Sequence, residues 1–450
     1  MTAAPQISTV QDITEAPAQQ PFLRRPGVVE RVITGLMIFV FSFSLPTEWF
    51  VRVGNSSANT IQGGSPLTTL VFLSFLAFAI IGLNGNWHIL RAALGREPLV
   101  PALVGLIGLS SLWSNNSGET VTTFVVIMIT MMAGYYLSIR YHLEESMYLA
   151  GVAFAFGLFA NYGFIFFFQD FGLDTINVGT DGGSKWSGVF VTKNELGRIA
   201  SLSLIVFSFL ARIRRSFFVW PLLAVLAGVQ VVASDSATSL GATFGIIALT
   251  IVFLGFRGRK TLYGATAVTM TSIFSVLTAL AATNIVVATG LLGKNSTFTG
   301  RLPLWIDSWN FGVLDRFWLG HGWLAFWNED VSFPVRIRAN FPAPHAHNAF
   351  IDAWLYAGPI AAAILLAIYV RGLVWGARNI RTQPTAVGLV PVILIAYGFI
   401  FSLTEAGVVR RDISFVLFVL AIVTAAKNKG KRISYVESMR VRATERAITR

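Results

Sequence analysis

The chain of 450 residues contains no cysteine. Disulfide bonds, thiolate metal sites and catalytic thiols are therefore excluded. Any loop outside the apolar regions has to be ordered by packing alone.

Charged residues are also in short supply. They make up 12% of the chain, against 54% hydrophobic residues, whereas a soluble domain carries roughly 25% charged residues. The stretches between charge clusters are apolar runs of about 17–25 residues, enough to cross ~30 Å of hydrocarbon in helical form. The composition predicts an all-α polytopic membrane protein.

The apolar runs predict about 12 transmembrane helices. The first run is followed by many more and lacks a small-residue cleavage site, so it does not resemble a removable signal peptide. The expected spans are residues 32–50, 66–83, 99–114, 121–138, 147–168, 196–211, 217–233, 240–256, 264–289, 350–370, 387–404 and 413–426.

The distribution of charge predicts the orientation. With the N-terminus inside, the cytoplasmic segments hold 23 of the 34 lysines and arginines and 8 of the 22 acidic residues. The positive-inside rule expects this bias, so both termini are expected in the cytoplasm. The net charge of +12 is thus a topology signal, and no nucleic-acid partner is expected.

The spans divide the chain into five segments. Residues 1–31 form a cytoplasmic tail that begins polar and disordered, and residues 32–289 contain spans 1–9. Residues 290–349 form a long outer loop, and residues 350–426 contain spans 10–12. Residues 427–450 form a basic cytoplasmic tail, expected at anionic lipid headgroups.

The outer loop of residues 290–349 is too long for a simple connection. Structureless loops of this length are uncommon, and this one is rich in Trp, Phe and Pro. We therefore expect it to fold into a lid. Leu302–Leu314 is expected to form an amphipathic helix in the bilayer interface, with Trp and Leu facing lipid.

Three of the five histidines, His321, His345 and His347, lie in this loop. The simpler interpretation is that they are interfacial polar residues. The H-x-H spacing suggests a metal, yet no third or fourth ligand follows at a recognisable spacing and HExxH is absent. We expect neither a metal nor another cofactor.

Several basic residues oppose the positive-inside bias and need an explanation. One explanation is snorkelling to outer headgroups. The other is a phosphate-bearing ligand, which lysine binds as a point charge and arginine as a fork. The residues concerned are Lys193, Arg198, Arg301, Arg336, Arg338, Arg410 and Arg411.

The spans themselves are almost free of ionisable residues. They contain no chain of buried acids for protons and no arginine-rich voltage helix. A twelve-span transporter or flippase would also show similarity between its halves, which the sequence lacks. These observations favour a site at the outer interface.

Five motifs follow one another along the outer loops, and together they carry a resemblance. They are W-x-G-x-F-x-x-K-N-x-L-G (Trp186–Gly197), S-x-S-x-T (Ser234–Thr238), T-G-R-x-x-x-W (Thr299–Trp305), F-W-L-G-x-G (Phe317–Gly322) and H-x-H-N-x-F-I-D (His345–Asp352). Over roughly residues 31–425 the chain resembles the O-antigen ligase/polymerase superfamily. Within it, the chain is most similar to the succinoglycan-type exopolysaccharide polymerases.

The resemblance implies a GT-C glycosyltransferase in a bacterial inner membrane. Such enzymes transfer an oligosaccharide from undecaprenyl diphosphate to a sugar hydroxyl at the periplasmic face, without metal and with inversion. The acceptor is a lipid-linked repeat unit in a polymerase and lipid A-core in an O-antigen ligase, and no residue here separates the two. The implied partners are lipid-linked donor and acceptor, membrane lipids, and chain-length regulator and export proteins.

The resemblance also implies which residues bind the donor. Arg301 matches the family's loop arginine and is expected to stabilise the departing diphosphate. Lys193 and Arg198 are expected to help it, with Asn194 beside them in the site.

On the acceptor side, His347 matches the family histidine and is expected to take the proton from the hydroxyl. His345 is the alternate. Asn348 and Asp352 are expected to orient the ring or the sugar. Glu405 is expected to contact acceptor sugar, with a carboxylate at headgroup level as the alternative.

One position departs from the family pattern. Relatives commonly carry a basic residue where Ala237 stands, and the nearby Asp235 adds a negative charge. The diphosphate site is then one cation short. Three explanations stay open: Lys193 or Arg410 substitutes, the donor binds with another geometry, or activity is reduced.

Overall fold

The structure is a computed structural model. It describes residues 26–45, 49, 66–174, 185–214, 218–256, 301–339, 343–382, 385–407 and 409–427.

Helices dominate the described residues. The two short strands, β1 (Leu173–Asp174) and β2 (Lys185–Trp186), pair antiparallel. The helices are α1 (Val28–Phe43), α3 (Pro66–Gly82), α4 (Trp87–Arg96), α5 (Leu99–Leu109), η2 (Ser110–Leu112), α6 (Ser117–Arg140), α7 (Leu143–Phe167), α8 (Gln169–Gly172), α9 (Lys193–Ile213), α10 (Val219–Ala233), α11 (Ala237–Phe256), α13 (Arg301–Ser308), the π-helical turn η4 (Trp309–Val313), η5 (Ala325–Trp327), α14 (Glu329–Ala339), α15 (Ala349–Thr382), α16 (Thr385–Ser402) and α17 (Ile413–Lys427).

Among the described residues, 4 helices are long and apolar enough to cross a membrane: α6, α7, α9 and α15. The count becomes 5 if α3 and α4, which meet at a bend of 107°, form one broken span. Shorter apolar helices accompany them, so the protein is an all-α, multi-pass membrane protein. Every expected span overlaps a helix except residues 264–289, which lie outside the described residues.

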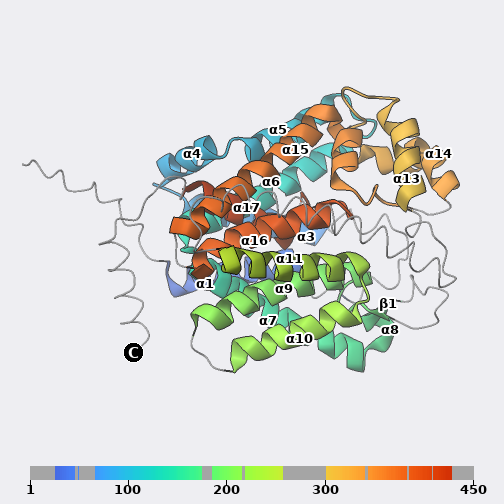
Figure 1. The fold of residues 1–450 in the computed structure, drawn as a ribbon. Coiled ribbons are helices and arrows are strands. Elements are labelled where there is room, and N and C mark those ends of the chain that lie inside the picture. Colours follow the sequence, from blue (N-terminus) through green and yellow to red (C-terminus); the bar gives the residue numbers. More distant parts are fainter. Residues whose placement is uncertain are drawn as a thin grey trace, which may run out of the picture.

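The best-buried helix is α17. Its residues from Ile413 to Val423 are all buried, because α6, α15 and α16 surround it. Gly134 on α6 permits this packing, since a Cβ there would lie 2.6 Å from Cβ of Val419. Figure 1 shows the long helices side by side, with α13 and α14 together at one end of the bundle.

Four helices, α9, α11, α15 and α17, begin at this end of the bundle. We call it the site end, since the candidate site described below lies there. The described parts of the expected lid are residues 301–339 and 343–349, and its helices α13 and α14 lie at this end (Figure 1). The expected helix over Leu302–Leu314 is present as α13 followed by η4.

The lid is attached to a break in α15. The backbone leaves the helical region at Ala357 and Gly358, and Gly358 has φ 73°. The carbonyl of Leu355 accepts a hydrogen bond from the His321 N–H at 2.7 Å, and the carbonyl of Tyr356 accepts one from the lid as well. The lid thus binds carbonyl groups close to the break, and its position is fixed relative to the bundle.

Candidate functional site

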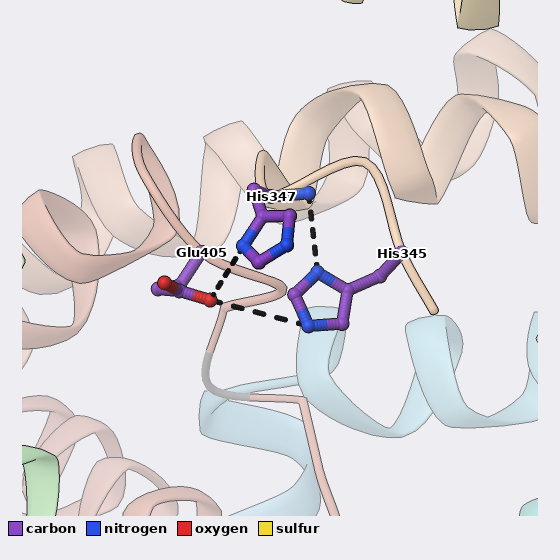
Figure 2. Close-up of side chains that lie close together, drawn as sticks. All are labelled: His345, His347 and Glu405. Atoms are coloured by element: carbon purple, nitrogen blue, oxygen red, sulfur yellow. Dashed lines mark hydrogen bonds and ion pairs between the residues drawn. The ribbon is translucent and has the colours of Figure 1, made fainter. Parts of the chain in front are cut away.

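Glu405 lies at the centre of a polar cluster at the site end. It follows α16 and is only 4% exposed. Its Oε2 accepts a hydrogen bond from Nδ1 of His347 at 3.0 Å, and its Oε1 accepts one from Nη2 of Arg301 at 3.0 Å. Nδ2 of Asn194 donates to the same Oε1 at 3.5 Å. Three segments far apart in the sequence therefore meet at one carboxylate (Figure 2 shows its two histidine neighbours).

The surroundings of Glu405 keep it ionised. Burial raises the pKa of this carboxyl, but His347, Arg301 and His345 together lower it to about 2. A buried anion at neutral pH is stable only when it is paired. The cluster therefore holds a fixed negative charge beside its imidazoles.

His347 has an unusual backbone conformation. Its φ of 51° lies in the left-handed region, which costs a residue other than glycine on the order of 1–3 kcal/mol. Two contacts offset this strain: its N–H donates to Nδ1 of His345 at 3.1 Å, and its ring bonds to Glu405. With Nδ1–H donating to the carboxylate, the lone pair of the neutral imidazole lies on Nε2.

His345 has the opposite tautomer. Its Nδ1 accepts the hydrogen bond from the backbone of His347, so the ring hydrogen lies on Nε2. That nitrogen is 4.0 Å from Oε2 of Glu405. Burial and the neighbouring imidazole of His347 lower the pKa of His345 well below its usual value. His345 is therefore a neutral hydrogen-bond donor, and its tautomer does not suit it to act as a base.

The ligand atoms of His345, His347 and Glu405 lie within 4.8 Å of one another, a spacing that can hold a metal ion. Glu405 could not be identified as the third ligand from the sequence, because 58 residues separate it from His347. Two features of the cluster fit a metal poorly. A ligating histidine normally donates its second ring N–H, whereas Nδ1 of His345 accepts one. The Arg301 guanidinium also occupies the same carboxylate.

Arg301 connects two of the motifs. It is the first residue of α13, and its side chain is 17% exposed. Besides Glu405, both of its terminal nitrogens lie 3.4 Å from Oγ1 of Thr238, in the first turn of α11. The arginine of T-G-R thus lies against the threonine of S-x-S-x-T. Sequence reasoning did not single out Thr238, although its motif was noted.

Arg198, which we expected to help Arg301 bind the diphosphate, lies in a buried ion pair. It is 6% exposed, and its Nη1 donates to Asp412 and, at 3.0 Å, to Oγ of Ser414. Burial raises the pKa of Asp412, but Arg198 and Arg410 lower it below its usual value. The Arg198 charge is therefore matched by a carboxylate, and the pair joins the start of α9 to the start of α17.

Arg410 and Lys193 are two further basic residues among those expected to bind the diphosphate. Nε of Arg410 is 3.5 Å from Oδ2 of Asp412, and its side chain is 29% exposed. Lys193 opens α9, where its backbone N–H donates to Asp174 at 3.0 Å, and its side chain is half-buried. Both cations are more accessible than Arg198.

Asn348 organises the start of α15. Its Oδ1 accepts hydrogen bonds from the backbone N–H groups of Phe350 and Ile351, at 3.0 and 3.2 Å. Its Nδ2 donates to the carbonyl of Leu403 at 3.4 Å. The side chain therefore caps the helix and ties it to the segment that carries Glu405.

Asp352 ties the H-x-H loop to the lid. It is 2% exposed, and its Oδ1 accepts from the Ala346 N–H at 2.9 Å and from Nε1 of Trp327 at 3.0 Å. Because Ala346 separates the two histidines, this bond helps to fix both rings. Asp352 therefore stabilises the conformation of the H-x-H loop and links it to the lid.

The first two motifs pack directly on each other. A Cβ at Gly197 would lie 2.6 Å from Oγ of Ser239 and 2.8 Å from Oγ of Ser234, so only glycine leaves room for them. Asp235, which seemed to bring the wrong charge, pairs with Lys185 at 2.7 Å. Its negative charge is thus matched locally.

His321 lies apart from the cluster. It is buried in the lid, with Nε2 2.9 Å from the carbonyl of Gly312 and Nδ1 3.3 Å from the Asn115 amide. Burial lowers its pKa. Both ring nitrogens therefore bind protein groups, as expected of a structural histidine.

No family model matches the chain. The chain is 32% identical over 209 residues to the exopolysaccharide production protein ExoQ of Rhizobium meliloti (strain 1021). The alignment covers 42% of this chain and 46% of the relative, so the chain spans about half the length of the curated relative it matches. The match is a partial similarity to a protein of exopolysaccharide production.

Proposed function

We propose that the protein is an exopolysaccharide polymerase of the GT-C type. It would transfer an oligosaccharide from undecaprenyl diphosphate to a sugar hydroxyl of a second lipid-linked unit, at the periplasmic face of the inner membrane. The observation that carries the proposal is the meeting of His347, Arg301 and Glu405 in one cluster. The likeness to ExoQ supports a role in exopolysaccharide production.

His347 is the general base of the proposed reaction. Glu405 holds Nδ1–H, which leaves Nε2 to take the proton from the acceptor hydroxyl. The acceptor oxygen then bonds to the anomeric carbon of the donor while the carbon–oxygen bond to the diphosphate breaks. The Glu405 anion stabilises the imidazolium that forms.

In the proposed reaction, the guanidinium of Arg301 stabilises the negative charge of the departing diphosphate. The diphosphate is already a stable anion, so its departure needs positive charge rather than an acid. A guanidinium has five N–H donors, and the two contacts to Thr238 at 3.4 Å are long enough to give way to phosphate oxygens. Nε2–H of His345 adds a neutral donor.

Further positive charge has to come from basic side chains that are more exposed than Arg198. Arg301 is matched by Glu405, and Arg198 by Asp412. We therefore assign Arg410 and Lys193 to the role of the basic residue that Ala237 lacks. Arg198 then acts by holding α9 and α17 together.

The test uses a strain that lacks this protein and expresses it from a plasmid, with Arg301→Ala and His347→Ala as variants. The expected result is loss of long polymer and accumulation of single lipid-linked repeats. Arg338→Ala, which removes a cation stacked on Phe311 at 4.3 Å, is the matched control and should leave polymer length unchanged. Normal polymer from both site variants at normal expression would refute the proposal, and loss of lipid A-core linkage instead would indicate a ligase.

A further inference from the structure

The lid helix α13 presents an apolar stripe to its surroundings. Leu302 and Ile306 on α13 and Trp309, the first residue of η4, are 54%, 51% and 37% exposed. Their spacing of four and three residues places them on one face of the helix. The opposite face, with Leu304 and Ser308, is fully buried. The stripe thus belongs to the surface of an otherwise well-packed helix.

The stripe begins beside the site cluster. Arg301 precedes Leu302 directly, and its guanidinium bonds to Glu405. Trp305 lies between Arg301 and the stripe on the helix surface, and its Nε1 donates to the carbonyl of Ala346 at 2.7 Å. This bond fixes the rotation of α13 relative to the H-x-H loop. The guanidinium of Arg301 and the apolar stripe are therefore held in a fixed position relative to each other.

We propose that this stripe binds the first part of the polyisoprenoid tail of the donor, while Arg301 holds its diphosphate; the inference rests on the proposed function. A lipid diphosphate has a charged head joined directly to an apolar chain. A site for it needs a cation next to an apolar track, which is the arrangement of Arg301 and the stripe. The track runs for about 10 Å along the helix axis.

The neighbouring helix α14 provides a comparison. Phe333 and Ile337 on α14 are 58% and 60% exposed and lie one turn apart. They form a similar apolar surface on the lid, but neither is adjacent in sequence to a residue of the cluster. If these residues only contacted bilayer lipid, both surfaces would bind lipid equally. A donor whose diphosphate is bound at Arg301 would instead place its tail on the stripe alone.

The first experiment compares two donors that carry the same oligosaccharide, one on undecaprenyl diphosphate and one on ethyl diphosphate, whose two carbons are too short to cover the stripe, with purified protein in vesicles. In Leu302→Ser/Ile306→Ser the KM for the long-chain donor should rise roughly tenfold, with kcat and the short-chain KM unchanged. Phe333→Ser/Ile337→Ser is the control and should match wild type. An equal effect on both donors, or none, would overturn the inference.

A second measurement uses the absence of native cysteine. In Ile306→Cys the single thiol should react with a maleimide more slowly when undecaprenyl diphosphate is present, and Phe333→Cys should be unaffected. Equal protection of both thiols would overturn the inference in favour of general lipid contact. Failure of the wild-type protein to transfer from either donor would instead refute the proposed function, so the two failures are distinguishable.

Discussion

Nδ1 of His347 donates a hydrogen bond of 3.0 Å to Oε2 of Glu405, across 58 residues of chain. His347 directly precedes the helical cap of α15, and Glu405 follows α16. The bond therefore depends on the packing of these two helices. It sets the tautomer of the imidazole and supplies a buried anion to stabilise its protonated form.

Replacing Glu405 by glutamine tests this positioning role. The amide keeps the size of the side chain but removes the negative charge. We expect kcat to fall roughly 10²–10⁴-fold, because the imidazolium loses its counter-ion. Transfer assays in vesicles measure the change. Glu405→Asp, which keeps the charge, should recover part of the rate, and a Gln variant as active as wild type would exclude the role.

The low pKa of Glu405 predicts a dependence of stability on acid. Its folded pKa of about 2 lies below the ordinary 4.5, so the folded state binds the proton less readily than the unfolded state. This contribution, on the order of 3 kcal/mol, is present above about pH 4.5 and is lost as the pH falls toward 2. Melting temperatures from pH 6 to 3 should fall less steeply in Glu405→Gln. Identical slopes would contradict the assignment.

The two histidines are expected to differ in their effect on rate. His347→Asn keeps a side chain that tolerates the left-handed conformation but removes the base. Its kcat should fall roughly 10²–10⁴-fold with little change in melting temperature. His345→Asn removes a neutral donor and the acceptor of the His347 N–H but no base, so we expect a loss of about tenfold. A larger effect at His345 would reverse the two assignments.

Arg198 and Arg410 are expected to separate into a structural and a binding role. Arg198→Ala leaves Asp412 buried without its main partner, so stability should fall by about 3–5 kcal/mol. The double variant Arg198→Met/Asp412→Leu should recover much of it. Arg410→Ala should instead raise the donor KM roughly tenfold at unchanged melting temperature. If Arg198→Ala is stable but loses donor affinity, the structural role is wrong.

Chelators should leave the transfer rate unchanged. The hydrogen bond from the His347 backbone to Nδ1 of His345 favours a tautomer that does not ligate through Nε2. Preincubation with EDTA followed by a rate measurement checks this. A lost rate that returns on adding Zn²⁺ or Mg²⁺ would show that the cluster of His345, His347 and Glu405 holds a metal.

Hydropathy alone located most of the helices, because an apolar run long enough to cross a bilayer is a strong and local signal. The break in α15 was missed although Pro359 marks it, since the apolar run continues through the break. The short helix α4 was also missed. It is amphipathic, with Leu90 and Ala93 buried, and lies within a segment assigned to a connection.

The sequence motifs predicted the candidate site residues, but they did not predict which residues these contact. Arg301 and His347 meet as expected of one site, through Glu405. The pairing of Arg198 with Asp412 could not be foreseen, because 214 residues separate them and only the folded arrangement of the helices brings them together. The same holds for Thr238 and Arg301, which are 63 residues apart.

The most direct test of the account is a double-mutant cycle on the transfer rate of purified protein in vesicles, with His347→Asn, Glu405→Gln and the double variant. If Glu405 acts through His347, the double variant should be no slower than the slower single variant. Rate losses that multiply in the double variant would show that the two residues act independently, and would contradict the account.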